Sequence, residues 1–268
     1  MSKNTNALAI SYMLFLLLLT VSGCFSGLFA RVVNCLAFLI PVFLALFLTP
    51  KDKTDRQKYL TINKKGAAVS APLIFPTVFL VIIISFITTL IISTLTGRQN
   101  SVELGDSYLL ALINHALLPA ILEEALFRYL PMRLLAPYSP RGTIVLSSLF
   151  FALLHTDVFT IPYALFAGMV FMSVNLATDS IIPSIVIHLI NNALSVTLMY
   201  IDRPDVTAII YATVTVAAII SVVFIIIRRK SYVALLNKLT ERGEGVPFTV
   251  GAIVLTALTL LLTVMKLF

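Results

Sequence analysis

Charged residues are scarce in this chain, and their scarcity sets the first limits on its fold. Only 12% of the 268 residues are charged, whereas 59% are hydrophobic and the mean hydropathy is +1.03. A soluble domain carries charge on about a quarter of its residues. No internal repeat or low-complexity stretch stands out, and the hydrophilic segments are short. The composition therefore disfavours a soluble globular protein and indicates a membrane protein.

Cysteine is almost absent as well, with only Cys24 and Cys35, one in each of the first two apolar runs. Neither a disulfide nor a cysteine-based metal site can be argued from them. Residues 21–24, Val-Ser-Gly-Cys, follow Lys3 and an apolar run, and so resemble the lipobox of a bacterial lipoprotein signal. A first membrane span that ends in small residues is the commoner explanation, and we expect that one.

Long apolar runs are what the chain has in abundance. About 20 apolar residues are enough to cross a bilayer as a helix, and a bilayer admits only helices or closed barrels. The runs occupy residues 7–30, 32–50, 66–97, 107–122, 142–156, 158–178, 180–201, 206–227 and 245–265. We predict an all-α, polytopic transmembrane bundle of about nine spans, with eight possible, that forms one integral membrane domain over residues 1–268.

The placement of lysine and arginine predicts the orientation of this bundle. If the N-terminus is cytoplasmic and all nine spans cross, 15 of the 19 basic residues lie on the cytoplasmic side. Only Arg31, Arg98, Arg203 and Lys266 lie on the other side. This asymmetry follows the positive-inside rule, so we predict a cytoplasmic N-terminus. Basic loops beside anionic lipid also account for the net charge of +7 without nucleic acid as a partner.

Polar clusters divide the chain into three blocks. Residues 107–200 carry every cluster and are expected to form a four-helix catalytic core. Residues 1–96 and 206–268 are expected to be accessory spans, since the last two apolar runs contain no acidic residue and no histidine. Between those two runs, residues 231–239 are expected to form a short helix along the membrane surface.

The first cluster is Glu123-Glu124-x-x-x-Arg128. On a helix, Glu124 and Arg128 stand four residues apart with the acid first, which is the favourable order for a pair. Glu123 points about 100° away from Glu124. A buried ion pair that fixes helix packing would explain Glu124 and Arg128, but it would leave Glu123 without a helical partner of opposite charge. Glu123 is therefore the candidate general base.

Two later clusters, Phe151-x-x-x-His155 and His188-x-x-x-Asn192, supply groups with which such a carboxylate could work. Phe151 lies one turn before His155 and can pack against its imidazole, and His188 and Asn192 share one helix face. Ionisable groups in hydrocarbon are costly, so an intramembrane set of two carboxylates and two imidazoles indicates a functional site.

The helical rise of about 1.5 Å per residue relates the depths of these clusters. On the predicted topology Glu123, His155 and His188 reach a similar depth from the cytoplasmic side, so we expect them to meet around a cavity that opens to the cytoplasm. The remaining histidine, His115, stands alone on an apolar face, and we expect it to be a packed core residue.

In this order, the three motifs resemble the CAAX protease and bacteriocin-processing (CPBP) family of intramembrane proteases, also called the Abi family. The resemblance covers about residues 107–200. One departure is Tyr129, where many bacterial members carry glycine, but it removes no reacting group. The resemblance implies an intramembrane endopeptidase whose substrate is a membrane-associated peptide or protein. We expect a multi-pass protein of a bacterial plasma membrane.

Roles for individual residues are implied by the same resemblance. Glu123 matches the glutamate that activates water, and His155 matches the histidine that helps to position it. His188 and Asn192 match the pair that stabilises the oxyanion. Glu124, Arg128 and Phe151 occupy supporting positions. The implied mechanism needs no cofactor.

Zinc is the main mechanistic alternative. His155, His188 and Glu123 could form a zinc site with an open water position, as in hydrolytic zinc enzymes. Asn192 is a poor zinc ligand, however, and no His-Glu-x-x-His helix is present, so the metal-free mechanism is favoured. Two non-enzymatic alternatives also remain open, namely a small transporter with a proton or ion relay and an immunity or scaffold membrane protein that retains the motifs without turnover.

Overall fold

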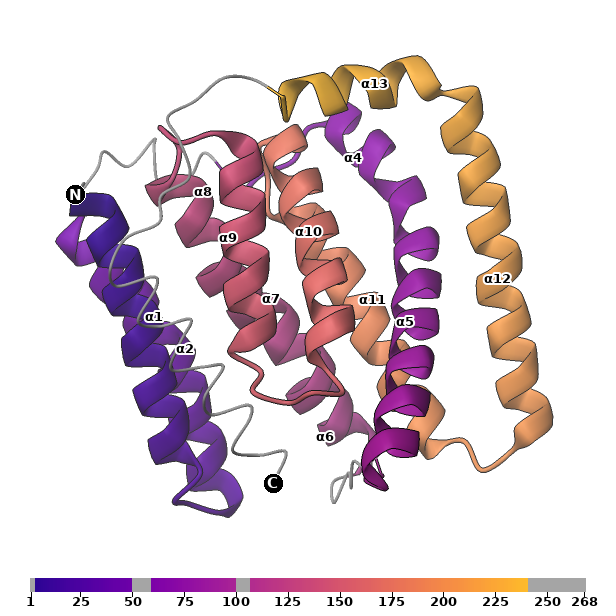
Figure 1. Ribbon diagram of the computed structural model, residues 1–268, viewed down its shortest axis with the longest axis horizontal. Helices are drawn as coiled ribbons and strands as arrows, with labels where there is room; N and C mark the ends of the chain where they lie inside the picture. The colour runs from indigo at the N-terminus through magenta and orange to yellow at the C-terminus, as the bar shows by residue number, and fades with distance from the viewer. Residues whose placement is uncertain (1–2, 50–58, 100–106, 241–268) are drawn as a thin grey trace.

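Every element that the computed structural model describes is helical (Figure 1). The structure describes residues 3–49, 59–99 and 107–240, and no strand occurs among them. The helices are α1 (Lys3–Ser22), α2 (Gly27–Leu48), α4 (Lys64–Ser70), η1 (Ala71–Leu73), α5 (Ile74–Thr96), α6 (Tyr108–Leu112), η2 (Ile113–Leu117), α7 (Leu118–Glu124), η3 (Ala125–Tyr129), α8 (Leu130–Leu134), α9 (Pro140–Leu153), α10 (Ile161–Thr178), α11 (Ile182–Tyr200), α12 (Pro204–Ile227) and α13 (Arg229–Lys238). Of these, η1 is a 3-10 turn, and η2 and η3 are π-helical turns. The predicted all-α fold is confirmed.

Seven of the described helical segments are long and apolar enough to cross a membrane. They are α1, α2, α4 to α5, α6 to α8, α10, α11 and α12. The predicted polytopic transmembrane bundle is therefore confirmed, and the chain is a multi-pass membrane protein. The predicted span at 142–156 corresponds to the shorter helix α9, whose 14 residues extend only about 21 Å. The predicted span at 245–265 lies outside the described residues.

The bundle has two ends that differ in charge. In Figure 1, the start of α1, helices α4, α8 and α13, and the connection from α8 to α9 lie at the upper end. The basic residues there include Lys64, Lys65, Arg141, Arg228 to Lys230 and Lys238. We call this the basic end. The turn between α1 and α2, the end of α5 and the start of α6 lie at the other end, which we call the opposite end. The orientation of the two ends in a cell stays a prediction.

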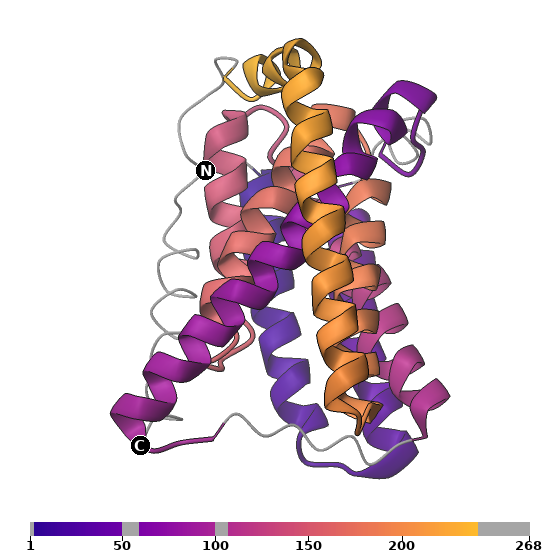
Figure 2. The ribbon, with the colours of Figure 1, turned by 90° about the vertical axis from the view of Figure 1, so that its right-hand side faces the viewer.

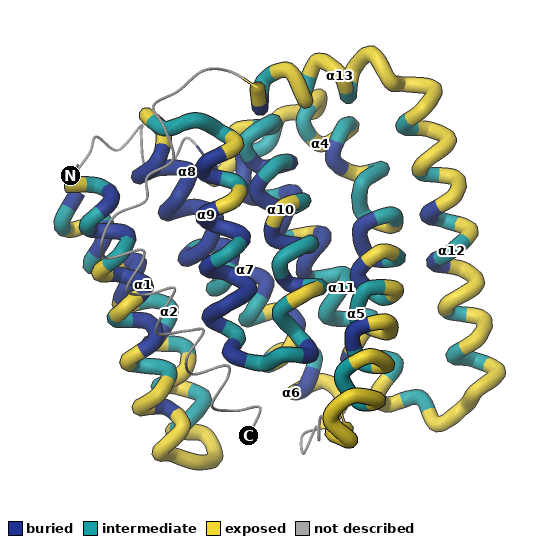
Figure 3. Tube along the Cα trace, viewed as in Figure 1, coloured by how far each residue is buried: buried dark blue, intermediate teal, exposed yellow. Residues whose placement is uncertain are grey.

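The core lies where α7 to α10 meet α1 and α2. Figure 3 shows buried residues concentrated in α7, α8, α9 and α10, whereas α12 is mostly exposed. Leu126, Leu130 and Leu134 are fully buried within this core. Figure 2 shows α5 inclined across the bundle beside α12. The apolar outer faces of the helices are the surfaces that a bilayer would cover.

Residues 108–134 form one long helix that contains two π-helical turns, η2 and η3. Each turn ends two residues before a proline, Pro119 or Pro131. Proline has no N–H group, so it cannot donate to the carbonyl four residues earlier. Ser147 of α9 donates instead to the carbonyl of Phe127, the one that Pro131 leaves without its helical donor. Single π-helical turns are frequent at functional sites, and these two flank Glu123 and Glu124.

Helix α9 ends earlier than the sequence led us to expect. It stops at Leu153, so His155 lies in the turn that follows rather than on the helix. Thr156 takes a positive φ of 50° in this turn, a conformation that a β-branched residue rarely adopts. The end of α9 is therefore fixed by backbone geometry that apolar patterning does not reveal.

The short surface helix expected at 231–239 is present as α13. Polar contacts at both ends of α13 attach it to the bundle. The Tyr232 hydroxyl donates to the Val69 carbonyl over 3.0 Å, and the Lys238 ammonium pairs with Asp179 over 2.6 Å. Figure 1 shows α13 lying across the basic end.

Candidate functional site

Glu124 and Arg128 form a fully buried ion pair at the centre of the bundle. The Arg128 Nε lies 3.4 Å from Glu124 Oε2, and both side chains are 0% exposed. The guanidinium also lies 4.1 Å from the centroid of the Phe151 ring. The pair expected from the sequence is thus present. Because both charges are out of water, removing either one would leave the other uncompensated.

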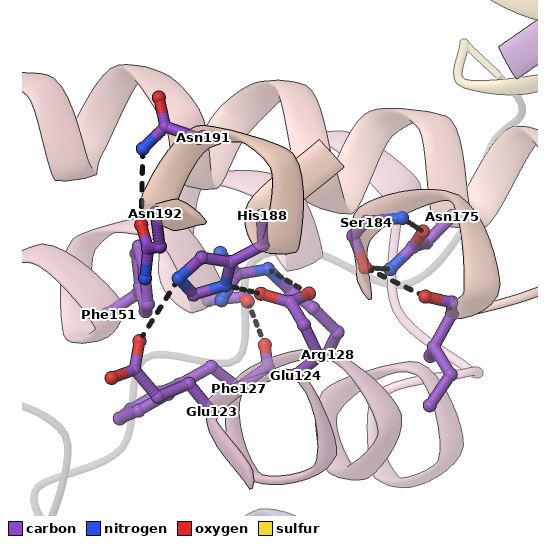
Figure 4. Close-up of polar contacts among 12 residues, drawn as sticks. Glu123, Glu124, Phe127, Arg128, Phe151, Asn175, Ser184, His188, Asn191 and Asn192 are labelled. Atoms are coloured by element: carbon purple, nitrogen blue, oxygen red, sulfur yellow. Dashed lines mark hydrogen bonds and ion pairs between the residues drawn. The ribbon is translucent and has the colours of Figure 1, made fainter. Parts of the chain in front are cut away.

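His188 lies between the two neighbouring glutamates (Figure 4). Its Nδ1 is 3.0 Å from Glu124 Oε1, and its Nε2 is 3.7 Å from Glu123 Oε2. When Nδ1 carries a proton and donates to Glu124, Nε2 is the nitrogen directed at Glu123. The buried pair of Glu124 and Arg128 therefore orients the imidazole that faces Glu123.

Glu123 has different surroundings from Glu124, although the two are adjacent in sequence. Its side chain is 16% exposed and lines a cavity of about 580 Å³. The contact drawn for its carboxylate is with His188 (Figure 4). Glu123 therefore combines access to a cavity with an imidazole at close range, as a general base requires.

Four parts of the chain build the wall of this cavity. Helices α1 and α2 form one side, the α6 to α7 segment forms the other, and the turn after α9 closes it. The lining residues are Phe15, Leu19, Arg31, Asn34, Cys35, Phe38, Asn114, His115, Leu118, Pro119, Leu122, Glu123, Phe127, Leu154 and His155. The cavity thus brings together Glu123 and His155, which lie 32 residues apart in sequence.

His155 is oriented by the backbone of α9, the helix that precedes it. Its Nδ1 lies 2.6 Å from the Phe151 carbonyl oxygen, and its ring meets the Phe151 ring edge-on at 4.9 Å. When Nδ1 donates to that carbonyl, Nε2 is left for the cavity. Phe151 contacts both His155 and Arg128, so it connects the cavity wall to the buried ion pair.

Asn192 is placed less centrally than the other predicted residues. It lies one helical turn after His188 on α11, as expected, and it is half-buried. Its side-chain oxygen accepts a hydrogen bond from the Asn191 amide over 3.2 Å. Asn192 is not among the residues that line the cavity. His188 does not line the cavity either.

Sequence reasoning missed a buried polar contact that fixes the start of α11. The Asn175 side-chain amide donates to Ser184 Oγ over 2.6 Å, and the Ser184 N–H donates to Asn175 Oδ1 over 3.3 Å. Both residues are fully buried, and Ser184 lies one turn before His188. The available signal was an asparagine and a serine within otherwise apolar helices, which usually bond across helices.

The expectation for His115 was wrong. His115 is exposed rather than packed in the core, and it lines the cavity together with Asn114. The residues that α2 contributes, including Arg31 and Cys35, were also missed. Which face of an accessory helix meets the core depends on tertiary packing, and the apolar pattern of α2 does not specify it.

The described residues do not form a ready metal site. Within 3–49, 59–99 and 107–240, no group of three His, Cys, Asp or Glu side chains is arranged to hold a metal ion. The zinc alternative would require Glu123, His155 and His188 to converge on one point. The metal-free mechanism stays a prediction.

Comparison with known families gives one match. Residues 105–194 match the family described as Rce1-like, type II CAAX prenyl endopeptidase. This segment contains all three motifs, so the resemblance seen in the sequence is confirmed. No curated protein and no solved structure matches the chain significantly.

Proposed function

We propose that this chain is an intramembrane endopeptidase, because its residues 105–194 match the family described as Rce1-like, type II CAAX prenyl endopeptidase. Its substrate would be a membrane-associated peptide or protein, and its location would be a bacterial plasma membrane. The observation that carries this proposal is the position of Glu123. Its carboxylate lines a cavity that His155 also lines, and it is 3.7 Å from His188. The neighbouring Glu124 forms the ion pair with the buried Arg128.

The proposed reaction begins with a water molecule between Glu123 and His155. Glu123 accepts a proton from this water, and the water oxygen attacks the carbonyl carbon of the scissile peptide bond. His155 positions the water through the imidazole nitrogen that faces the cavity. The attack converts the carbonyl oxygen to an oxyanion in a tetrahedral intermediate.

Collapse of that intermediate breaks the bond between carbon and nitrogen. The proton held by Glu123 passes to the leaving amine, which departs neutral, and the carbonyl re-forms as a carboxylic acid. His188 and Asn192 would donate hydrogen bonds to the oxyanion, since donors directed at developing charge lower the barrier most. His188 can donate through an imidazole N–H group, and Asn192 can donate through its side-chain amide.

A peptide library separates this proposal from its alternatives. Purified wild-type protein should cleave a subset of peptides, and a Glu123→Ala variant of equal yield and thermal stability should cleave none. Equal cleavage by both proteins would contradict the proposed role of Glu123. Absence of cleavage by wild type, together with ion flux in proteoliposomes, would favour the transporter. Absence of both activities would favour an immunity or scaffold protein.

A further inference from the structure

Tyr12 of α1 is buried in the core that holds the candidate site. Its side chain is 0% exposed. The centroid of its ring lies 5.4 Å from that of Phe127 and 5.2 Å from that of Phe150. Because α1 precedes residues 105–194, Tyr12 lies outside the segment that matches the family, and the three motifs give it no role.

The hydroxyl group of Tyr12 has no hydrogen-bond partner among the described residues. A phenylalanine would make the same ring contacts, so the oxygen adds nothing to the packing. Burial of a hydroxyl without a hydrogen bond is unfavourable, and the hydroxyl of a buried tyrosine usually has a partner. The Tyr12 oxygen therefore needs a partner that the described side chains and backbone do not supply.

The guanidinium of Arg128 has the same need. Its charge is balanced by Glu124 at 3.4 Å, and it lies 4.1 Å and 5.4 Å from the ring centroids of Phe151 and Phe171. None of its three nitrogens, however, makes a hydrogen bond to a described residue. An arginine carries several N–H donors in a fixed fork. In Arg128 the charge is thus compensated, whereas the donors are not satisfied.

Aromatic rings connect these two unsatisfied groups. The Phe127 ring, which packs against Tyr12, lies 5.4 Å from the Phe151 ring, and the Arg128 guanidinium lies over the Phe151 ring. The phenol and the guanidinium interact electrostatically, although no direct hydrogen bond joins them. A polar interaction beyond hydrogen-bond distance is often mediated by water. A buried water requires about two to four polar partners, which the Tyr12 hydroxyl and the Arg128 N–H groups provide.

We propose that one ordered water bridges the Tyr12 hydroxyl and the Arg128 guanidinium, and that Tyr12 is thereby a positioning residue for the imidazole of His188. The water accepts a hydrogen bond from Arg128 and shares a second one with the hydroxyl. Arg128 held in this way keeps Glu124 in place, and Glu124 lies 3.0 Å from Nδ1 of His188 (Figure 4). The effect on catalysis rests on the proposed peptidase function, whereas the water bridge does not.

Thermal unfolding of a Tyr12→Phe variant tests the bridge, because a bridged and an unpaired hydroxyl predict different results. Removal of an unpaired buried hydroxyl should raise the Tm or leave it unchanged. Removal of a hydroxyl that is bridged to Arg128 should lower the Tm by about 2–4 °C, the usual effect of one lost hydrogen bond in a chain of this length. A Tm equal to or above that of wild type would overturn the proposal.

Tyr232→Phe is the matched control for loss of a tyrosine hydroxyl. Its hydroxyl donates to the Val69 carbonyl over 3.0 Å, and it belongs to α13 at the basic end, away from the candidate site (Figure 1). This variant should also lower the Tm, because it loses one hydrogen bond. It should leave the imidazole of His188 and the rate of peptide cleavage unchanged, so it separates a loss of stability from a loss of positioning.

Nitrogen NMR of the imidazoles tests the positioning role without catalysis. The chain has three histidines, so protein that is isotopically labelled at histidine gives few signals, and His115→Gln and His155→Gln variants assign those of His188 by elimination. In Tyr12→Phe the His188 signals should shift more than those of the other two histidines. In Tyr232→Phe they should stay in place. Unshifted His188 signals in Tyr12→Phe would reject the positioning role.

Peptide cleavage measures the consequence for turnover. Tyr12→Phe should lower kcat at least tenfold with KM unchanged, since a displacement of about 1 Å in a catalytic group can cost about 10²-fold. Tyr232→Phe should retain the kcat of wild type. Equal kcat in Tyr12→Phe and wild type would overturn the positioning role. If wild type cleaves no peptide, the proposed function fails, and the Tm and NMR results still decide whether Tyr12 is bridged to Arg128.

Discussion

Two adjacent carboxylates of one helix, Glu123 and Glu124, have contrasting surroundings. Glu124 is fully buried, where it pairs with Arg128 and accepts from His188. Glu123 lies at the edge of a cavity. The rotation of about 100° between successive helical residues produces this division, because it directs one side chain to the core and the other to the cavity. Substitution of Glu123 should therefore affect mainly activity, and substitution of Glu124 mainly stability.

Substitution of Glu123→Gln should remove activity and leave the fold intact. The amide keeps the size of the side chain but cannot accept the proton from water. General-base and electrostatic effects each contribute about 10²–10⁴ in rate, so the loss of kcat should reach several orders of magnitude. The measurement is single-turnover peptide cleavage, with thermal unfolding in detergent as the control for folding. Normal turnover would remove Glu123 from the mechanism.

Substitution of Glu124→Gln should act first on stability. It leaves the buried Arg128 charge without its partner, and breaking a buried pair in this way costs about 3–5 kcal/mol. The expected result is a lower Tm and a lower yield in detergent relative to Glu123→Gln, which is the matched control. A stable Glu124→Gln protein that has lost all activity would mean that the two glutamates exchange roles.

A variant of Asn192 and the metal content of the protein together distinguish the metal-free mechanism from the zinc mechanism. If Asn192 donates to an oxyanion, Asn192→Ala should lower kcat by about 10²–10³ without a change in bound metal. Elemental analysis of purified protein, before and after dialysis against a chelator, provides the second measurement, and we expect sub-stoichiometric metal and chelator-resistant activity. One zinc per chain, lost together with activity in His188→Ala, would instead establish a metalloprotease.

Among the elements, α9 and α10 approach each other closely beside the site. At Gly168 of α10, an added Cβ would lie 3.1 Å from Ser148 Cα and 3.4 Å from the Phe151 ring. The first distance is to backbone, which cannot move without shifting α9. Phe151 in turn contacts His155 and Arg128, so the separation of these two helices controls the geometry of the cavity wall.

Gly168→Ala should therefore reduce both stability and turnover. Overpacking a well-packed core typically costs about 1–3 kcal/mol. Gly23→Ala is the matched control, because the contact there is an ordinary 3.4 Å at an exposed helix end. Thermal unfolding and kcat/KM measure the two effects. Identical behaviour of the two variants would show that α9 and α10 separate without consequence for the site.

At the element scale, the positions of the helices were predicted better than their internal irregularities and their ends. Apolar runs located the described spans, since a bilayer requires long uninterrupted apolar helices. The π-helical turns before Pro119 and Pro131 were not predicted, because the effect of a proline depends on whether a partner such as Ser147 compensates its lost hydrogen bond. The early end of α9 was missed for a similar reason, because it depends on the backbone conformation of Thr156.

At the scale of the whole molecule, the charge difference between the two ends predicts the topology. A cysteine introduced at Lys238 or at Lys58, which lies outside the described residues, should resist an impermeant thiol reagent applied to intact cells, and one at Arg203 should react. Each is made in a chain in which Cys24 and Cys35 are changed to alanine. Labelling of Lys238→Cys from outside would invert the orientation and place the opposite end of the bundle in the cytoplasm.

The pairing of Glu124 with Arg128 was predictable because it depends on spacing along one helix. The meeting of His188 with both glutamates required several helices to pack, and the sequence indicated it only through similar depths and the family resemblance. The contribution of α1 and α2 to the cavity could not be predicted, because their apolar faces give no sign of which side meets the core. His115 was misassigned for the same reason.

The shortness of α9 has a consequence for the supply of water. Its 14 residues cover about 21 Å, whereas the hydrocarbon layer is about 30 Å thick. The turn that carries His155 therefore lies below the headgroups, at a depth where irregular backbone is tolerated only when it is buried in protein or lines a hydrated space. The bilayer can also thin locally around a short hydrophobic segment. Both effects would bring water, the second reactant of hydrolysis, into the hydrocarbon layer that otherwise excludes it.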